Sequence, residues 1–288
     1  MATRQAGRSS RRTTRPPGRH RAKAPAASRR RRFRRRYAVV YDIEGPRVRL
    51  GMLWFVVAAV ALAIGPLTTA AVYGGAAAVA GAQVARVWRR RKLRPNEAVA
   101  AVMAGAMALG ACLGAGGAGI GLLGGVAGAL IVAAGDRRSP NPMLADAGWT
   151  IQCALFPGLA GMSMVLLARL DQGSAIALLL LVSAYETGDY IVGSGSRSSL
   201  EGPAAGLTAI VVITFIVSTL PISALSFGEA WFFGGMVAVL APLGQLFASA
   251  LLPTAASPAS ALRRLDSLLL AAPVWCIGIG AIVSSSPA

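Results

Sequence analysis

Apolar residues fill the chain from about residue 51 onward, in runs of the length needed to cross a membrane. A spanning helix needs about 20 mostly apolar residues, within a range of about 17–25. Gly65-Pro66 separates the first two runs, and the stretch GAGGA at 114–118 separates the third from the fourth. The pattern predicts an all-α, polytopic membrane bundle of about nine transmembrane helices, at 51–66, 67–87, 97–113, 115–135, 145–168, 174–192, 203–220, 229–252 and 267–285.

Composition agrees with the membrane class, because 55% of the residues are hydrophobic and only 14% are charged. The net charge of +18 belongs mainly to residues 1–36, which hold fifteen of the 29 basic residues and no acid. This segment has too few apolar residues to fold. We therefore predict a disordered Arg-rich cytoplasmic tail at 1–36, a juxtamembrane segment at 37–50 and a transmembrane domain at 51–288.

The basic tail is typical of a segment that holds the N-terminus in the cytoplasm and contacts anionic phospholipid, at about 1 kcal/mol per basic residue near the surface. A secretory signal peptide is not expected, because no apolar core follows the start of the chain before residue 51. Nucleic-acid binding is not expected either, since no folded reader accompanies the tail and only Phe33 could stack on a base.

The basic residues of the loops predict the topology. With a cytoplasmic N-terminus, the loops at 88–96, 136–144, 193–202 and 253–266 face the cytoplasm and contain ten of the fourteen remaining basic residues, whereas the opposite loops contain only Arg169. This distribution follows the positive-inside rule. We expect nine spans in the plasma membrane, with the C-terminus outside.

Residues for ordinary catalytic chemistry are scarce. Cys112, Cys153 and Cys276 all lie in apolar segments without pairing or metal-ligand spacing, so we interpret them as packing residues. The one histidine, His20, lies in the tail. A histidine-based metal or general-base site in the membrane domain is therefore excluded.

Acidic residues gather at the predicted cytoplasmic ends of the helices. Glu186 and Asp189 end the sixth segment, Glu201 begins the seventh, and Asp266 begins the ninth. Ionisable groups so close to hydrocarbon are costly and mark a site or an anchor. We expect these four acids to converge around one cavity. Two further acids lie on the same side, near the fifth segment: Asp136 and Asp146.

Two blocks of sequence combine these acids with hydroxyls and glycines. The first block is ETGDYIVG at 186–193 followed by EGPAAGL at 201–207, and the second is GQLFAS at 244–249 followed by LRRLDSLLLAAPV at 262–274. A site for a nucleotide and a lipid head group needs carboxylates for metal, arginine for phosphate and glycine for close approach.

At these blocks the chain resembles the CDP-diacylglycerol synthases (phosphatidate cytidylyltransferases), polytopic enzymes that make CDP-diacylglycerol from CTP and phosphatidic acid with divalent metal. The positions that match or stand for the family's motifs are Glu186, Thr187, Tyr190, Gly193, Glu201, Gly202 and Gly206 in the first block, and Gly244, Leu246, Ser249, Arg264, Asp266 and Ser267 in the second. The resemblance implies a residual head-group or metal site of Glu186, Thr187, Tyr190, Glu201, Ser249, Arg264 and Asp266. It also implies CTP as a ligand and, in an active enzyme, Mg²⁺ on Glu201 and Asp266.

The departures from the family lie mainly in the second block. Gln245 and Arg263 stand where the family has acids, and Leu252-Pro253 stands where it has a Lys-Arg pair that faces phosphate. The family's Lys-Asp and Pro-Gly-His-Gly-Gly elements have no counterpart at 254–261, and Arg197-Ser198-Ser199-Leu200 replaces Lys-Lys-Thr-Trp. Each lost electrostatic contact of this kind commonly costs about 100- to 1000-fold in rate.

Two functions follow from these matches and departures. The chain is either a non-catalytic homologue, a pseudoenzyme that binds phospholipid or a protein partner, or a divergent nucleotidyltransferase of phospholipid biosynthesis that still uses CTP. An unrelated ion-coupled transporter is disfavoured, because no charged residue lies deep within a predicted span. Gly/Ala-rich helix faces are compatible with a homodimer.

Individual residues also have purely structural interpretations. Asp266 suits the first turn of a helix, where exposed N–H groups and the helix dipole favour an acid. Arg263 and Arg264 suit a topology anchor. The remaining alternatives are neutralisation of Arg197 by Glu186 and Glu201, and interfacial positions for Tyr190 and Trp275.

Overall fold

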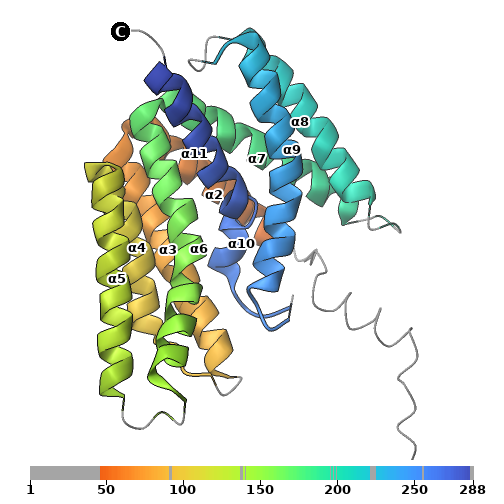
Figure 1. Cartoon of the computed structure of the whole chain (residues 1–288). Coiled ribbons are helices and arrows are strands. Elements are labelled where there is room, and N and C mark those ends of the chain that lie inside the picture. Colours follow the sequence, from red (N-terminus) through yellow and green to blue (C-terminus); the bar gives the residue numbers. More distant parts are fainter. Residues whose placement is uncertain are drawn as a thin grey trace, which may run out of the picture.

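The protein is an assembly of helices. The computed structural model describes residues 46–90, 93–136, 139, 141–194, 196, 198, 200–220, 225–254 and 256–285. The predicted tail at 1–36, most of the juxtamembrane segment and Arg197 lie outside these residues. The described elements, in chain order, are α2 (Pro46–Ile64), α3 (Pro66–Arg89), α4 (Glu97–Gly110), a 3₁₀ turn η1 (Ala111–Leu113), α5 (Ala115–Gly135), α6 (Met143–Leu170), α7 (Gln172–Gly193), α8 (Glu201–Thr219), α9 (Phe227–Ala250), α10 (Ser260–Leu265) and α11 (Leu268–Ser285) (Figure 1).

Each of the nine predicted apolar segments coincides with a helix, to within several residues at its ends. Within the described residues, seven helices are long and apolar enough to cross a membrane, and shorter apolar stretches occur at Leu50–Ile64 and Glu97–Leu113. The prediction of an all-α bundle with helices of membrane-spanning length is thereby confirmed, while a count of nine spans stays a prediction. The six-residue helix α10 lies in a segment that the sequence predicted as a loop.

The break between α2 and α3 is a single residue. Gly65 has a φ of 141°, a region that only glycine adopts readily, and Pro66 occupies the first helical position, where a missing N–H costs nothing. The hydroxyl of Thr68 donates to the carbonyl oxygens of Ala61 at 2.7 Å and Gly65 at 2.8 Å. These bonds hold the reversal that the Gly-Pro pair predicts.

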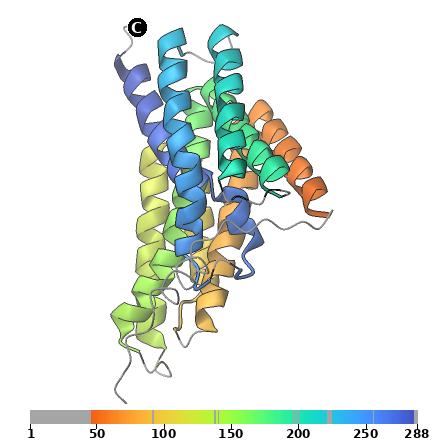
Figure 2. The same cartoon turned by 90° about the vertical axis from the view of Figure 1, so that its right-hand side faces the viewer.

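Helix α6 lies at the centre of the bundle, in contact with α3, α4, α5 and α11, while α7 pairs with α8. Figure 2 shows α2 inclined to the axis that most of the other helices share. Small residues allow the helices to pack closely. A Cβ at Gly81 on α3 would lie only 2.9 Å from the carbonyl oxygen of Ala100 on α4. Close backbone approach of this kind is the usual packing of membrane helices.

The outer surface of the bundle is apolar. Ile120 on α5 is 73% exposed, Phe232 on α9 is 69% exposed and Ile277 on α11 is 75% exposed. Hydrocarbon rather than water suits such a surface, since large exposed apolar patches are rare on soluble monomers. The fold is that of a multi-pass membrane protein.

Trp275 corrects one expectation. It was predicted at the membrane interface, but its side chain is fully buried and packs against Phe233, with ring centroids 4.9 Å apart. The interfacial interpretation of Trp275 is therefore wrong, because α11 packs between α6 and α9 and turns this side chain into the core.

Candidate functional site

The second block forms a joint between α9, α10 and α11. Asp266 and Ser267 connect α10 to α11, and Gly244 on α9 lies directly against their backbone. A Cβ at Gly244 would stand 2.4 Å from the carbonyl oxygen of Asp266, which is closer than atoms can approach. Glycine at this position thus allows α9 to contact the start of α11.

Asp266 is almost completely buried at this joint, with 7% of its surface exposed. Its Oδ1 accepts hydrogen bonds from the backbone N–H of Ser267 at 2.8 Å and from the Ser267 hydroxyl at 3.4 Å. Its Oδ2 lies 3.8 Å from Nη1 of Arg263. The carboxylate therefore satisfies one of the free amides at the start of a helix and pairs with a cation of its own chain.

Arg263 links this carboxylate to α9. Its Nη1 donates to Oγ of Ser249 at 3.0 Å, and the Ser249 hydroxyl donates to the carbonyl oxygen of Gln245 at 3.1 Å. The side-chain oxygen of Gln245 in turn accepts from the hydroxyl of Tyr185 on α7 at 3.4 Å. A chain of polar contacts thus runs from α7 through α9 to α10.

Helix α7 contributes two acids to the same place. Glu186 is half-buried and interacts with the Ser267 hydroxyl and with the charges of Asp266, Arg264 and Asp189. Asp189 itself is 3% exposed. We call this group the polar cluster, and its members are Tyr185, Glu186, Asp189, Gln245, Ser249, Arg263, Arg264, Asp266 and Ser267.

Three predicted site residues do not join the polar cluster. Thr187 is exposed, and its hydroxyl donates to the carbonyl oxygen of Ser183 on its own helix at 2.7 Å. The side chains of Tyr190 and the exposed Glu201 form no hydrogen bond or ion pair with any described residue. Of the four acids expected to converge around one cavity, Asp189 and Asp266 lie within electrostatic range of Glu186. Glu201 does not join them, and the cavity itself stays a prediction.

Sequence reasoning missed several members of this site. Arg263 was interpreted as an anchor, although its spacing of three residues from Asp266 is the spacing of neighbours on a helix. Ser267 matches a motif position but was not assigned to the site, and Tyr185 gave no signal, because a tyrosine in an apolar run is common. Tyr73 on α3 is fully buried in the electrostatic field of Glu186, and its hydroxyl has no hydrogen-bond partner among the described residues.

The donor set does not fit a divalent metal ion. Mg²⁺ is held by carboxylate oxygens that remain open to it. In the polar cluster, one oxygen of Asp266 receives two hydrogen bonds and the other faces the Arg263 guanidinium. Among the residues that the structure describes, no three His, Cys, Asp or Glu side chains form a group able to hold a metal.

Compared with known proteins, the chain matches no protein-family model and no curated protein sequence. The resemblance to the CDP-diacylglycerol synthases rests on the motif residues of the two blocks.

Proposed function

We propose that this protein is a non-catalytic homologue of the CDP-diacylglycerol synthases, in which the polar cluster binds the phosphate group of an anionic phospholipid. The observation that carries this proposal is the placement of Arg263, which donates to Ser249 and pairs with Asp266. The guanidinium of Arg263 thereby lies beside Asp266, the acid that the resemblance implies as a metal ligand.

Phosphoryl transfer depends on metal and cations positioned around the reacting phosphate. Asp266 is committed to Arg263 and to the start of α11, and Gln245 presents a neutral amide where the family has an acid. No catalytic step through a metal follows from this arrangement. The contacts of Asp266 with Arg263 and Ser267 instead hold the α10–α11 joint rigid, which supports a binding surface beside it.

Arg264 is the residue that we assign to the lipid phosphate. It is half-buried, and its Nη1 lies 3.1 Å from the position that a Cβ would occupy at Gly51 on α2. The neighbouring Leu50 and Leu53 of α2 are 54% and 58% exposed, so this guanidinium lies beside the lipid-facing surface. A planar guanidinium matches phosphate with two parallel hydrogen bonds.

The proposal places the protein in the plasma membrane, with nine spans and a cytoplasmic N-terminus. Arg89, Arg94, Arg263 and Arg264 lie in or beside connections that this topology assigns to the cytoplasm, which supports it by the positive-inside rule. The polar cluster would then face the anionic cytoplasmic leaflet.

One observation favours the alternative, a divergent enzyme that uses CTP. Glu186, at the position that resembles the family's first motif acid, lies within electrostatic range of Asp266 from the second motif. The two blocks thus meet in space. Measurement of CTP-dependent turnover separates this alternative from the binding protein.

The binding proposal is tested by lipid retention. The full chain is reconstituted with equal amounts of phosphatidylglycerol and phosphatidylcholine, repurified in mild detergent, and the retained lipid is quantified. We expect Arg264→Gln to lower retained phosphatidylglycerol about tenfold, as for loss of one charge-assisted contact. Arg169→Gln is the matched control, because Arg169 lies at the C-terminal end of α6, on the opposite side of the membrane in the proposed topology. It should retain the wild-type amount. Equal retention by the two variants would contradict the proposal.

A further inference from the structure

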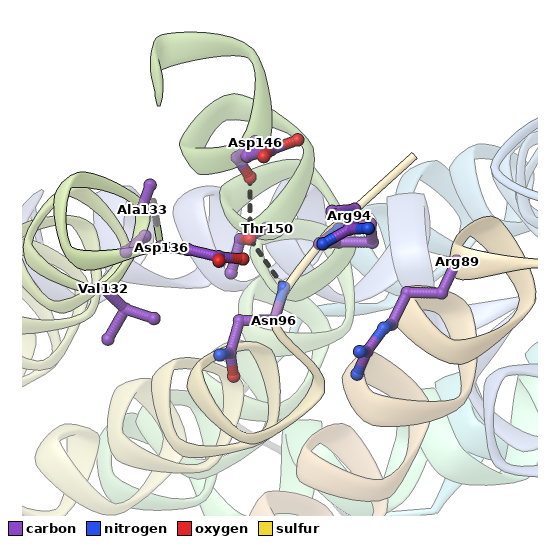
Figure 3. Close-up of a pocket in the computed structure, with 10 residues that line it drawn as sticks. Arg89, Arg94, Asn96, Val132, Ala133, Asp136, Asp146 and Thr150 are labelled. Atoms are coloured by element: carbon purple, nitrogen blue, oxygen red, sulfur yellow. Dashed lines mark hydrogen bonds between the residues drawn. The ribbon is translucent and has the colours of Figure 1, made fainter. Parts of the chain in front are cut away.

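A second polar site lies away from the polar cluster, at the junction of α3, α4, α5 and α6. A cavity of about 80 Å³ opens there (Figure 3). One water needs about 10–15 Å³ on this scale, so the space holds several water-sized groups. Its lining residues are Arg89, Arg94, Pro95, Asn96, Ala129, Val132, Ala133, Asp136, Asp146 and Thr150.

Opposite charges occupy different walls of this cavity. Arg89 and Arg94 lie on one side of Asn96 and Thr150, Asp136 lies on the other side, and Asp146 lies beyond Thr150 along α6 (Figure 3). The two cations come from the end of α3 and the connection to α4, whereas the two acids come from the end of α5 and the start of α6. The cavity therefore offers an anion-binding half and a cation-binding half.

Donors and acceptors remain available at Arg94, Asn96 and Asp146, whereas Nη1 of Arg89 already pairs with Oε1 of Glu97 at 3.5 Å. Arg94 forms no hydrogen bond or ion pair with any described residue, and the side-chain NH₂ of Asn96 has no acceptor among them. Asp146 is only 5% exposed; it accepts from the hydroxyl of Ser139 and from Nδ2 of Asn141 at 2.9 Å. An ionised carboxylate has about four acceptor positions, so capacity remains.

The cavity lies at the level where hydrocarbon gives way to water. Val132 and Ala133 belong to the last turn of the apolar helix α5, and Asp136 follows directly after it. Close by, Trp88 on α3 stacks on Trp149 on α6, with ring centroids 4.9 Å apart. Paired tryptophans near helix ends are typical of the membrane interface, which is the layer of lipid head groups.

We infer that this cavity binds the head group of a zwitterionic aminophospholipid, with the phosphate on Arg94 and Arg89 and the primary ammonium on Asp146 and Asp136. A head group with only negative charge satisfies the arginines but faces two carboxylates. A choline head group satisfies the charges, but its quaternary nitrogen donates no N–H bond, whereas a primary ammonium donates three. Ethanolamine phosphate meets both walls.

The helices that bear this cavity also accommodate an acyl chain. A groove of about 450 Å³ runs along α4 and α5 nearer the middle of the membrane, lined only by apolar residues: Ala98, Val99, Val102, Met103, Ala106, Ile120, Gly121, Gly124, Gly125 and Gly128. The glycines leave room where larger residues would fill the groove. The acyl chain of a lipid whose head group lies in the cavity would thus meet an apolar surface along α4, the helix that begins at Asn96.

The test uses the full chain in bilayers of equal parts phosphatidylethanolamine, phosphatidylcholine and phosphatidylglycerol. The protein is extracted in mild detergent, and its bound lipids are measured by native mass spectrometry. We expect phosphatidylethanolamine to exceed each of the other two lipids by about tenfold, since each charge-assisted contact contributes about this factor. Arg94→Gln and Asp146→Asn should each remove most of that excess, whereas Arg90→Gln, outside the cavity, should preserve it.

Three results would overturn the assignment. Equal retention of the three lipids, or preference for phosphatidylglycerol, would show that the two walls do not select a zwitterion. An unchanged preference in both Arg94→Gln and Asp146→Asn would place the lipid elsewhere. Full displacement of bound phosphatidylethanolamine by soluble glycerophosphoethanolamine at millimolar concentration would show that the ligand is a soluble metabolite. Because Arg94 carries no described partner, its variant keeps the test valid if Asp146→Asn fails to fold. Arg264→Gln should leave this preference intact, so the outcome is independent of the polar cluster.

Discussion

Nη1 of Arg263 lies 3.8 Å from Oδ2 of Asp266, three residues further along the chain, and the same nitrogen donates to Ser249 on α9 at 3.0 Å. One guanidinium therefore ties the start of α11 to the preceding membrane helix. It does so from a position at which the resemblance to a metal-dependent enzyme implies an acid. This relationship underlies both the proposed loss of catalysis and the stability of the joint.

Removal of the Asp266 charge should destabilise the fold. We expect Asp266→Asn to lower the free energy of unfolding by about 1–3 kcal/mol, less than the ~3–5 kcal/mol for a fully buried pair, because the Arg263 side chain stays 25% exposed. Thermal or denaturant unfolding in detergent measures this change. A double-mutant cycle with Arg263→Gln should give a coupling of at least about 0.5 kcal/mol. Strictly additive effects would mean that the two side chains do not interact.

The contact of α9 with the α10–α11 joint should not tolerate one added methyl group. We expect Gly244→Ala to lower the free energy of unfolding by about 1–3 kcal/mol, because its Cβ would stand 2.4 Å from the carbonyl oxygen of Asp266. Gly235→Ala on the same helix is the control, since a Cβ there meets nothing within 4 Å. The melting temperatures of the two variants should differ clearly. If both melt at the wild-type temperature, α9 does not approach the joint as described.

Magnesium should not stabilise the wild-type protein. The carboxylate of Asp266 is occupied by Arg263 and Ser267, so millimolar Mg²⁺ should leave the melting temperature unchanged. The double variant Gln245→Asp/Arg263→Ser supplies a second acid and removes the internal cation, and we expect Mg²⁺ to raise its melting temperature. A Mg²⁺-dependent rise in the wild type that disappears in Asp266→Asn would refute the proposed role of Arg263.

The nine-span topology predicts which helix ends are accessible from outside the cell. In a variant without its three cysteines, a single Ser284→Cys near the end of α11 should react with a membrane-impermeant maleimide on intact cells. Ser198→Cys, in the connection between α7 and α8, should react only after the membrane is opened. Labelling of Ser198→Cys but not of Ser284→Cys on intact cells would show that the topology is inverted. Labelling of neither variant or of both would require a different number of spans.

The sequence predicted the helices well, because membrane spans are determined by length and hydrophobicity and because Gly65-Pro66 marks a break by its own geometry. It predicted α10 as a loop, since six residues carry too little pattern to reveal a helix. Trp275 was misplaced for a different reason: a tryptophan in an apolar run has the same sequence signal whether it faces lipid or packs against Phe233.

Prediction of the candidate site was partial. The motif positions Glu186, Ser249, Arg264 and Asp266 do meet in space, whereas Thr187 and Glu201 point to other surroundings. Membership of a motif indicates the helix and its end, but the rotation of α7 and α8 decides which side chains face inward. The cavity at the junction of α3, α4, α5 and α6 depends on four elements at once, so no local stretch of sequence indicates it.

The most direct test of the central claim is CTP-dependent formation of CDP-diacylglycerol. The purified full chain, reconstituted with phosphatidic acid, is incubated with labelled CTP and Mg²⁺, and labelled lipid is measured against empty vesicles. We expect no product above that background, in the wild type and in Asp266→Ala alike. Robust product that is abolished by both Asp266→Ala and Glu186→Ala, in variants that remain folded, would contradict the account and establish an active enzyme.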